Sequence, residues 1–365
     1  METAGNTSSG TADTDLSLML ADDFMFDLGV PFTDSGFTAP SWAQWPGVLP
    51  PSKPNWFMAA ETWEIFRSTQ SSAIVPVGRA TMKKYVALLQ SWFERWVIAG
   101  SNPFVHARLY STNFPACVQV AYASLSTYVH RTPANTDTVL QIIEERSANL
   151  LLENGAVRPK PDEQEWVEGP CPEEEVNLFT QLARLHALMV YQIIGLHDGD
   201  IRARHVAEGR MAVHNIWAAK LFHSAGKILP DTHSAVATHL AGFLPMPSTY
   251  AREQWYLWIL SESIRRTWLV AVSISSVYTA LQKRWAACPG GVMYTNRSGL
   301  WEAESPAEWE RQCGYEKVGF LQRFECSRLL DEAGPADVDE FGTAMMDMTF
   351  DGDLLAKWRD SGGRL

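Results

Sequence analysis

Cysteines are few in this sequence, and none lie close enough together for a common metal or redox motif. The five are Cys117, Cys171, Cys288, Cys313 and Cys326. No two of them form a CxxC pair, which excludes zinc sites built on such pairs and thioredoxin-type redox motifs. An odd number of scattered cysteines indicates reduced thiols in the nucleus or the cytosol.

Basic residues are missing from the first 52 residues, which carry seven acidic ones. All 30 lysines and arginines lie from Lys53 onward, and the whole chain has a formal net charge of −12. Domains that bind nucleic acid usually carry a basic surplus. The charge therefore predicts that this chain does not bind nucleic acid directly.

Long apolar runs are also missing. The most hydrophobic window, residues 257–277, is interrupted by Glu262, Arg265 and Arg266, so it is not expected to cross a bilayer. The N-terminus lacks the basic and apolar regions of a secretory signal. We therefore expect no membrane partner.

Motifs for catalysis and cofactor binding are not found. The sequence has no GxGxxG after a predicted strand, no glycine-rich loop ending in Gly-Lys-Ser/Thr and no GxSxG elbow. The nine histidines include no pair at the spacing that a metal-binding helix needs. We expect no catalytic residue, no metal and no cofactor, and hence a protein that is not an enzyme.

Helical periodicity covers most of the chain from Glu61 onward. Residues 82–97 place their apolar side chains on one face, and further helices are predicted over 118–128, 139–151, 181–196, 201–222 and 252–285. Another begins near Pro306, and two short helices end the chain. No alternating strands are found, and residues 153–171 read as an exposed loop. The sequence predicts an all-α fold: one large multi-helix domain over residues 56–365, behind a disordered acidic arm over residues 1–55.

Tryptophan is abundant, with fifteen residues. Six of them lie at helical spacing beside other apolar residues: Trp92, Trp96, Trp217, Trp258, Trp268 and Trp285. Large aromatic side chains at such positions usually bury their surface between helices. We interpret these tryptophans as packing anchors and not as ligand-stacking residues.

Charged residues at two places in the helices invite a functional hypothesis. Glu262 and Arg266 stand four residues apart in an apolar helix, where charges are costly unless paired. They are either an internal salt bridge that fixes the helix register or a ligand-sensing pair. The second place, residues 197–204, holds a histidine, two aspartates and two arginines. We interpret it as a helix junction capped by Asp200 and not as an acid–base site.

Within the arm, residues 13–32 interleave acidic and apolar side chains. Such interleaving is typical of disordered activation segments, whose carboxylates keep the apolar residues solvated until a partner's groove binds them. The candidate partner-binding residues are Leu20, Phe24, Phe26 and Leu28. The alternative is a short amphipathic helix that docks on its own domain.

Five segments resemble, in the same order, the C-terminal regulatory (middle-homology) region of fungal binuclear zinc-cluster transcription factors. They are residues 103–110 (PFVHARLY), 132–152, 181–222, 265–268 (RRTW) and 299–309 (GLWEAESPAEW). The six-cysteine cluster and the basic segment that precede this region in the family, and that hold its DNA contacts, are not found in this sequence. Their place is taken by the acidic arm.

The resemblance implies a transcription-regulator-like protein that controls a fungal secondary-metabolite gene cluster. It implies a location in the nucleus, and a cytoplasmic location is left as an alternative. It would act through a DNA-binding partner or a coactivator, with homo- or heterodimers left open. The alternative is a pathway enzyme or small-molecule-binding protein with a pocket between the helices of 181–222 and 252–285. A deep pocket lined by converging polar groups would favour that alternative, and a packed core would favour the regulator.

Overall fold

The computed structural model confirms the predicted all-α class. It describes residues 23–27, 56–66, 77–160, 163–169, 177–230, 243, 249–314, 320–322 and 327–362, with the backbone alone for 23–27, 320–322, 327, 328 and 332. Eleven α-helices are found in these parts of the chain, together with short 3₁₀-helices and strands. Most of the predicted arm, and the connection over 231–248 apart from Phe243, lie outside the described residues.

The helices follow the sequence periodicity closely. They are α1 (Arg79–Ala99), α2 (Ala116–Val129), α3 (Thr136–Glu153), α4 (Leu178–His197), α5 (Ile201–Glu208), α6 (Met211–Ile228), α8 (Tyr250–Lys283), α9 (Pro306–Cys313), α10 (Ser327–Glu332), α11 (Glu340–Asp347) and α12 (Gly352–Asp360). The 3₁₀-helices are η2 (Trp56–Met58), η3 (Ala60–Trp63) and η5 (Pro335–Asp337).

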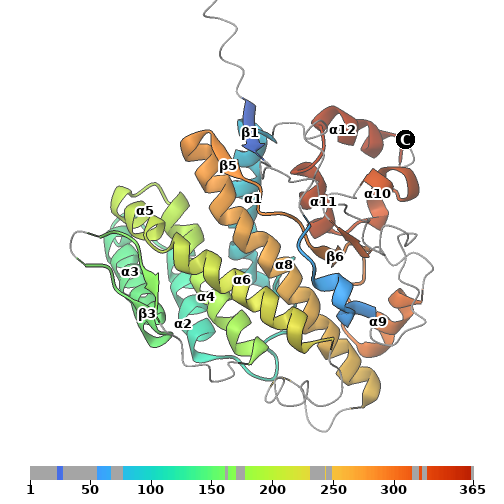
Figure 1. The fold of residues 1–365 in the computed structure, drawn as a ribbon, viewed down its shortest axis with the longest axis horizontal. Coiled ribbons are helices and arrows are strands. Elements are labelled where there is room, and N and C mark those ends of the chain that lie inside the picture. Colours follow the sequence, from blue (N-terminus) through green and yellow to red (C-terminus); the bar gives the residue numbers. More distant parts are fainter. Residues whose placement is uncertain are drawn as a thin grey trace, which may run out of the picture.

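Three helices, α4, α6 and α8, lie side by side at the centre of the molecule (Figure 1). Helices α2, α3 and α5 cover one side of this layer, and α9 to α12 lie on the other. Every residue of α4 from Gln181 to Leu196 is buried, and α8 is buried almost throughout its middle turns. A helix that is apolar all round must be enclosed by other helices, and this explains why these two form the core.

The helix ends are set by residues that the sequence shows. Asn177, Asp200, Thr249 and Ser305 each accept a hydrogen bond from a backbone N–H in the first turn of the helix they precede. Gly100 ends α1 in the left-handed conformation, with φ of 73°. The prediction that Asp200 caps the helix after it is thus confirmed.

Short strands are the first difference from the sequence prediction. They are β1 (Asp23–Asp27), β2 (Val77–Gly78), β3 (Ala156–Val157), β4 (Val167–Glu168), β5 (Trp285–Ala287), β6 (Met293–Thr295) and β7 (Phe320–Gln322). Strands β3 and β4 pair within residues 153–171, so this segment is a hairpin and not simply a loop. Strands this short carry no detectable period-2 pattern, and the sequence therefore gave no sign of them.

The second difference is a break in the helix predicted over 201–222. The chain forms α5 and then α6, separated by Gly209 and Arg210. The backbone of residues 163–169 passes against this break, where the Trp166 N–H donates to the Gly209 carbonyl at 2.8 Å. A Cβ atom at Gly209 would overlap the carbonyl oxygen of Gln164. The close approach requires glycine here, and the apolar periodicity on either side hides the break.

Replacing Gly209 with alanine is therefore expected to lower the free energy of unfolding by about 1–3 kcal/mol, because backbone must move to accommodate the methyl group. Gly352 is a matched control, since a Cβ atom there meets open space at the first turn of α12. Gly352→Ala should leave the stability unchanged or raise it slightly. Equal stabilities of the two variants in urea titrations would contradict the packing argument.

The C-terminal part differs from the prediction in one helix and in one tryptophan. Three short helices, α10, α11 and α12, end the chain where two were expected. Trp285 lies in β5 with 46% of its surface exposed, so its interpretation as a packing anchor was wrong. The other five tryptophans at helical spacing are each at most 3% exposed, as predicted.

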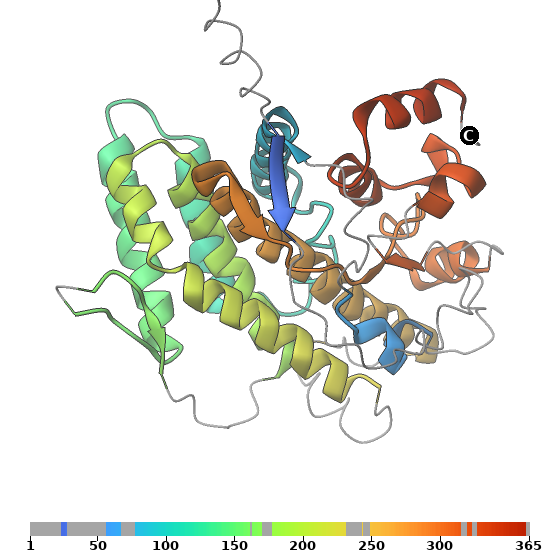
Figure 2. The same cartoon turned by 45° about the horizontal axis from the view of Figure 1, so that its top comes forward.

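The apolar core is divided into two clusters. The larger contains the buried faces of α1 to α9 together with Phe341, Ala344 and Met345 of α11. The smaller lies in the C-terminal lobe (residues 327–362) and consists of Leu329, Leu330, Val338, Met346, Leu355 and Trp358. Figure 2 shows this lobe on one side of α1 and α8. Helix α11 packs on both clusters and joins them.

Candidate functional site

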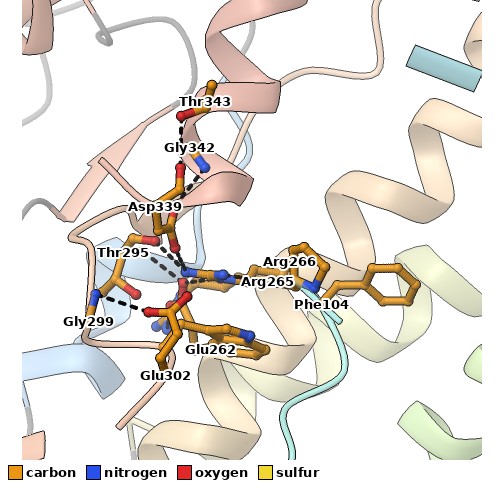
Figure 3. Close-up of polar contacts among 12 residues, drawn as sticks. Phe104, Glu262, Arg265, Arg266, Thr295, Gly299, Glu302, Asp339, Gly342 and Thr343 are labelled. Atoms are coloured by element: carbon orange, nitrogen blue, oxygen red, sulfur yellow. Dashed lines mark hydrogen bonds and ion pairs between the residues drawn. The ribbon is translucent and has the colours of Figure 1, made fainter. Parts of the chain in front are cut away.

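Four charged side chains lie together in the core near the middle of α8, and we call them the buried charge cluster (Figure 3). They are Glu262, Arg265 and Arg266 of α8 and Asp339, which precedes α11. The most accessible of them, Asp339, is only 4% exposed. Burying an unpaired charge costs several kcal/mol. The cluster is tolerated because its two carboxylates and two guanidiniums compensate each other.

Glu262 and Arg266 form the ion pair that their spacing predicts. The Arg266 Nε atom donates to Glu262 Oε1 at 3.0 Å. The same carboxylate oxygen accepts the backbone N–H of Thr295 at 2.8 Å. The pair therefore does more than fix the register of α8, because it also attaches the end of β6 to the helix.

The guanidinium of Arg266 reaches three further acceptors. It donates to the carbonyl oxygens of Pro103 and Thr295, at 2.9 and 2.7 Å, and to Asp339 Oδ2 at 2.6 Å. Two aromatic rings flank it, with the Arg266 Cζ atom 4.1 Å from the centroid of Trp301 and 4.8 Å from that of Phe341. Edge-on hydrogen bonds and face-on ring contacts together hold an arginine in a single orientation.

Arg265 connects the same turn of α8 to the segment before α1. Its guanidinium donates to the Phe57 carbonyl oxygen and, at 2.8 Å, to the Thr62 hydroxyl. Its Cζ atom lies 4.2 Å from the centroid of the Trp63 ring, and its Nη1 atom lies 3.6 Å from Glu262 Oε2. Arg265 thus attaches both 3₁₀-helices, η2 and η3, to α8.

Asp339 completes the cluster, and the sequence analysis missed it. Its Oδ1 atom accepts the Gly342 N–H at 2.7 Å and so caps α11, while Oδ2 pairs with Arg266. Its own N–H donates to the Asn296 carbonyl at 2.7 Å. An aspartate three residues before a glycine near the C-terminus carries no local sign of such a partner.

Burial governs the ionisation of the cluster. It lowers the pKa of Arg265 to about 10, although Glu262 opposes this. It raises the pKa of Asp339 to about 6, although Arg266 opposes this. Burial also acts to lower the pKa of Arg266, but Asp339 and Glu262 outweigh it and the pKa is raised. The partners shift differently because Arg266 faces two carboxylates and Asp339 only one guanidinium.

The geometry favours the structural alternative for Glu262 and Arg266 over the sensing one. Their side chains are at most 1% exposed, so a ligand has no direct access to them. The contacts of the cluster join four parts of the chain that are distant in sequence: η2 and η3, the loop at Pro103, β6 and the start of α11. A group of charges that joins separate segments is expected to specify how the segments assemble.

A second buried polar chain runs beside the cluster. The Tyr110 hydroxyl lies 2.6 Å from His186 Nδ1, and His186 Nε2 lies 2.7 Å from the Thr267 hydroxyl. An imidazole beside a hydroxyl is also the arrangement of a base and a nucleophile. Here Thr267 is fully buried, and burial lowers the pKa of His186 to about 3, which makes the imidazole a poor base. The chain is a structural connection between helices.

The helix junction predicted at residues 197–204 lies between α4 and α5. Asp200 Oδ1 accepts the Ala203 N–H at 2.7 Å and caps α5. Asp198 Oδ2 accepts the Tyr128 hydroxyl at 2.8 Å and pairs with Arg131 at 3.0 Å. Arg202 points outward to Glu144, at 2.9 Å. These groups bind different partners and do not converge on a common point.

The predicted partner-binding residues lie mostly outside the described part of the chain. Leu20 and Leu28 are not described, and Phe24 and Phe26 are described only by their backbone in β1. This strand pairs with β2 on one side and β5 on the other, with Phe24 opposite Val77 and Phe26 opposite Ala286. Their role in partner binding stays a prediction.

Apolar side chains meet between α6 and α8. The rings of Phe222 and Trp268 pack there at a tilt, with centroids 5.4 Å apart, and both residues are at most 3% exposed. The alternative function needs a pocket between the helices of 181–222 and 252–285, and Phe222 and Trp268 fill one part of that interface. Among the described residues, no group of three or more histidine, cysteine, aspartate and glutamate side chains is arranged to hold a metal. No described helix is both long and apolar enough to span a bilayer.

Comparison with known proteins gives one informative similarity. The chain is 26% identical over 260 residues to transcription factor gsfR2 of Penicillium aethiopicum. The aligned part covers 71% of this chain and 57% of that protein, so the chain spans less than two thirds of the relative's length. No family model matches, and no solved structure matches. The similarity supports a relationship to fungal transcription factors and a role in transcription regulation.

Proposed function

We propose that this protein regulates the transcription of a fungal secondary-metabolite gene cluster and acts in the nucleus. The observation that carries the proposal is the similarity to a fungal transcription factor along 260 residues. The segments that resemble the regulatory region of zinc-cluster factors, residues 103–110 to 299–309, support it. Pro103 and the arginines of the RRTW segment meet in the buried charge cluster, so motifs far apart in sequence serve one structural purpose.

In this proposal, DNA contact is supplied from outside these 365 residues, by a protein partner. The five cysteines include no CxxC pair, and the net charge of −12 opposes binding to a polyanion. The regulatory domain would then bind a DNA-binding protein or a coactivator. Residues 13–32 are the segment that we propose for coactivator binding, through Leu20, Phe24, Phe26 and Leu28.

Deletion of the gene is the direct test of the regulatory role. Transcripts of the neighbouring biosynthetic genes are expected to fall severalfold, while those of a housekeeping gene stay constant, because only the cluster depends on this regulator. Measurement by RNA sequencing of wild type, deletion and complemented strains would show this. Unchanged transcripts of all neighbouring genes would contradict the proposal.

The activation segment can be tested separately. Residues 13–32, fused to a heterologous DNA-binding domain, should activate a reporter, because the apolar side chains can fold into a coactivator groove. Combined Phe24→Ala, Phe26→Ala and Leu28→Ala substitutions should abolish activation. Asp22→Asn with Asp23→Asn should weaken it less, since these charges mainly keep the segment accessible.

The backbone pairing of β1 bears on the same experiment. Residues Asp23–Asp27 form a strand that pairs with β2 and β5. This pairing agrees with the alternative in which the segment docks on its own domain, but the segment docks as a strand and not as a helix. A silent fusion, or equal activity of the triple alanine variant, would leave docking as the only role of the segment. The coactivator surface would then lie on the helical domain.

A further inference from the structure

A pocket of about 150 Å³ lies on the surface where α1, α2 and α4 come together. It is distinct from the buried charge cluster and from the place between α6 and α8 considered above. All three helices contribute lining residues, so the hollow is built into the packing of three rigid elements. A pocket framed by helices keeps its shape better than one framed by loops.

The floor of the pocket is apolar and part of the core. Phe93, Leu125, Ile193 and Ile194 line it, and each is at most 3% exposed. An apolar cavity of about 150 Å³ is large enough to hold a benzene ring. The volume is below the ~300 Å³ of a typical drug-sized site. The pocket therefore fits one aromatic ring, either free or at the end of a larger molecule that projects into solvent.

The polar groups at the rim are of two kinds. Arg131 is already satisfied: its guanidinium stacks 3.7 Å from the centroid of Tyr128 and pairs with Asp198 at 3.0 Å. Gln90 and Glu94, on successive turns of α1, are exposed, and neither has a hydrogen-bond or ion-pair partner among the described residues. At the rim, the carboxylate of Glu94 can thus accept a hydrogen bond from a ligand, and the guanidinium of Arg131 beside it is held in place.

The electrostatics at the rim select the charge of the ligand. Glu94, Asp198 and the nearby C-terminal end of α2 all oppose an anion. The fixed guanidinium of Arg131 opposes a cation. A neutral group that can donate a hydrogen bond suits Glu94, because bonds from a neutral donor to a carboxylate are stronger than neutral pairs.

We propose that this pocket binds a neutral aromatic ring bearing a hydroxyl group, with the ring on the apolar floor and the hydroxyl donating to Glu94. The inference goes beyond the proposed function and does not depend on it. It assigns the chain a small-molecule site of phenolic specificity between α1, α2 and α4.

The test is a titration of the full chain with three single-ring probes that differ in charge: 4-methylphenol, benzylamine and benzoate. Methyl resonances of Ile193, Ile194, Leu125 and Val129 should shift with 4-methylphenol at millimolar concentration, a range set by the small size of the probe. Benzoate should bind at least about tenfold more weakly, because its carboxylate meets Glu94. Shifts at other methyl groups only, or tighter binding of benzylamine, would overturn the proposal.

Two variants separate binding from folding. Glu94→Gln should weaken the binding of 4-methylphenol about tenfold, because the charged acceptor of its hydroxyl group is lost. The position is exposed, so the substitution should leave the fold intact. Glu145→Gln, on the exposed side of α3, is the matched control and should bind as the wild type does. Val129→Phe should fill the pocket and abolish the shifts while circular dichroism stays helical. Unchanged affinity in Glu94→Gln would overturn the assignment of the hydroxyl partner.

Discussion

Replacing Arg266 with methionine is expected to lower the free energy of unfolding by about 3–5 kcal/mol, the usual effect of removing one partner from a buried ion pair. The substitution keeps the length of the side chain and removes its charge. It leaves the carboxylates of Glu262 and Asp339 in the core without the guanidinium that both of them contact at 3.0 Å or less. It also removes the donors to the Pro103 and Thr295 carbonyls.

The measurement is urea unfolding followed by tryptophan fluorescence and circular dichroism. Arg95→Met is the matched control, because Arg95 pairs at 2.7 Å with Glu340, the residue after Asp339, but at 40% and 45% side-chain exposure. That exposed pair should contribute at most about 1 kcal/mol. Equal losses in the two variants would show that burial of the cluster contributes nothing.

A double variant tests whether the loss comes from the unpaired charge. Arg266→Met combined with Asp339→Asn removes one of the stranded carboxylates together with the guanidinium. Its destabilisation should be smaller than the sum of the two single effects, by about 1–3 kcal/mol, since directly contacting residues couple. Strictly additive effects would contradict a direct interaction between the two side chains.

Acidification below pH 6.5 is expected to destabilise the protein steeply because its buried histidines are neutral. Burial, the largest cause in each case, lowers the pKa of His106 and His186 to about 3 and that of His214 to about 4. Arg266 adds to the shift of His106. The unfolded chain takes up a proton at each histidine near pH 6.5, and the folded chain does not.

The sign follows from proton linkage. A depressed folded pKa gives stability that is present above the unfolded pKa of 6.5 and is lost as the pH falls toward the folded value. Each of the three histidines contributes about 1.4 kcal/mol per pH unit in that window, or about 4 kcal/mol per unit together. Asp339 acts in the opposite direction, because its pKa is raised to about 6 and its contribution is lost as the pH rises through that value. Below pH 6 the effect of Asp339 on the slope of stability against pH therefore cancels the effect of one of the three histidines.

Urea titrations between pH 7.5 and 5 measure this slope. His186→Gln should reduce it by about 1.4 kcal/mol per pH unit, since one titrating group is removed while hydrogen bonding toward Tyr110 and Thr267 can be retained. A stability that does not vary between pH 6.5 and 5.5 would contradict a core with neutral histidines.

The helical fold was predictable because local signals and burial agree. The apolar face of residues 82–97 became α1, and Thr249 and Ser305 cap the helices that follow them. The prediction failed where long-range contacts decide. The break at Gly209 depends on the backbone of residues 163–169, and β5 pairs with β1 far earlier in the chain. Trp285 shows the same limit, because its spacing continues α8 although the helix ends at Lys283.

Half of the buried charge cluster could be found from the sequence. Glu262 and Arg266 are four residues apart, and charges in an apolar helix indicate a nearby partner. The partners of Arg265, Phe57 and Thr62, precede it by about 200 residues, and Asp339 follows Arg266 by 73. No periodicity connects residues so far apart, and only the folded chain brings them together.

Helix α11 packs on both apolar clusters, and this couples parts of the protein that share no sequence neighbourhood. Phe341 and Met345 pack in the larger apolar cluster, while Met346 packs in the smaller one with Trp358. The carboxylate that caps this helix is the one that binds Arg266. A tightly packed helix moves as a rigid body. Any rotation of α11 would therefore move Asp339 against Arg266 at the centre of α8.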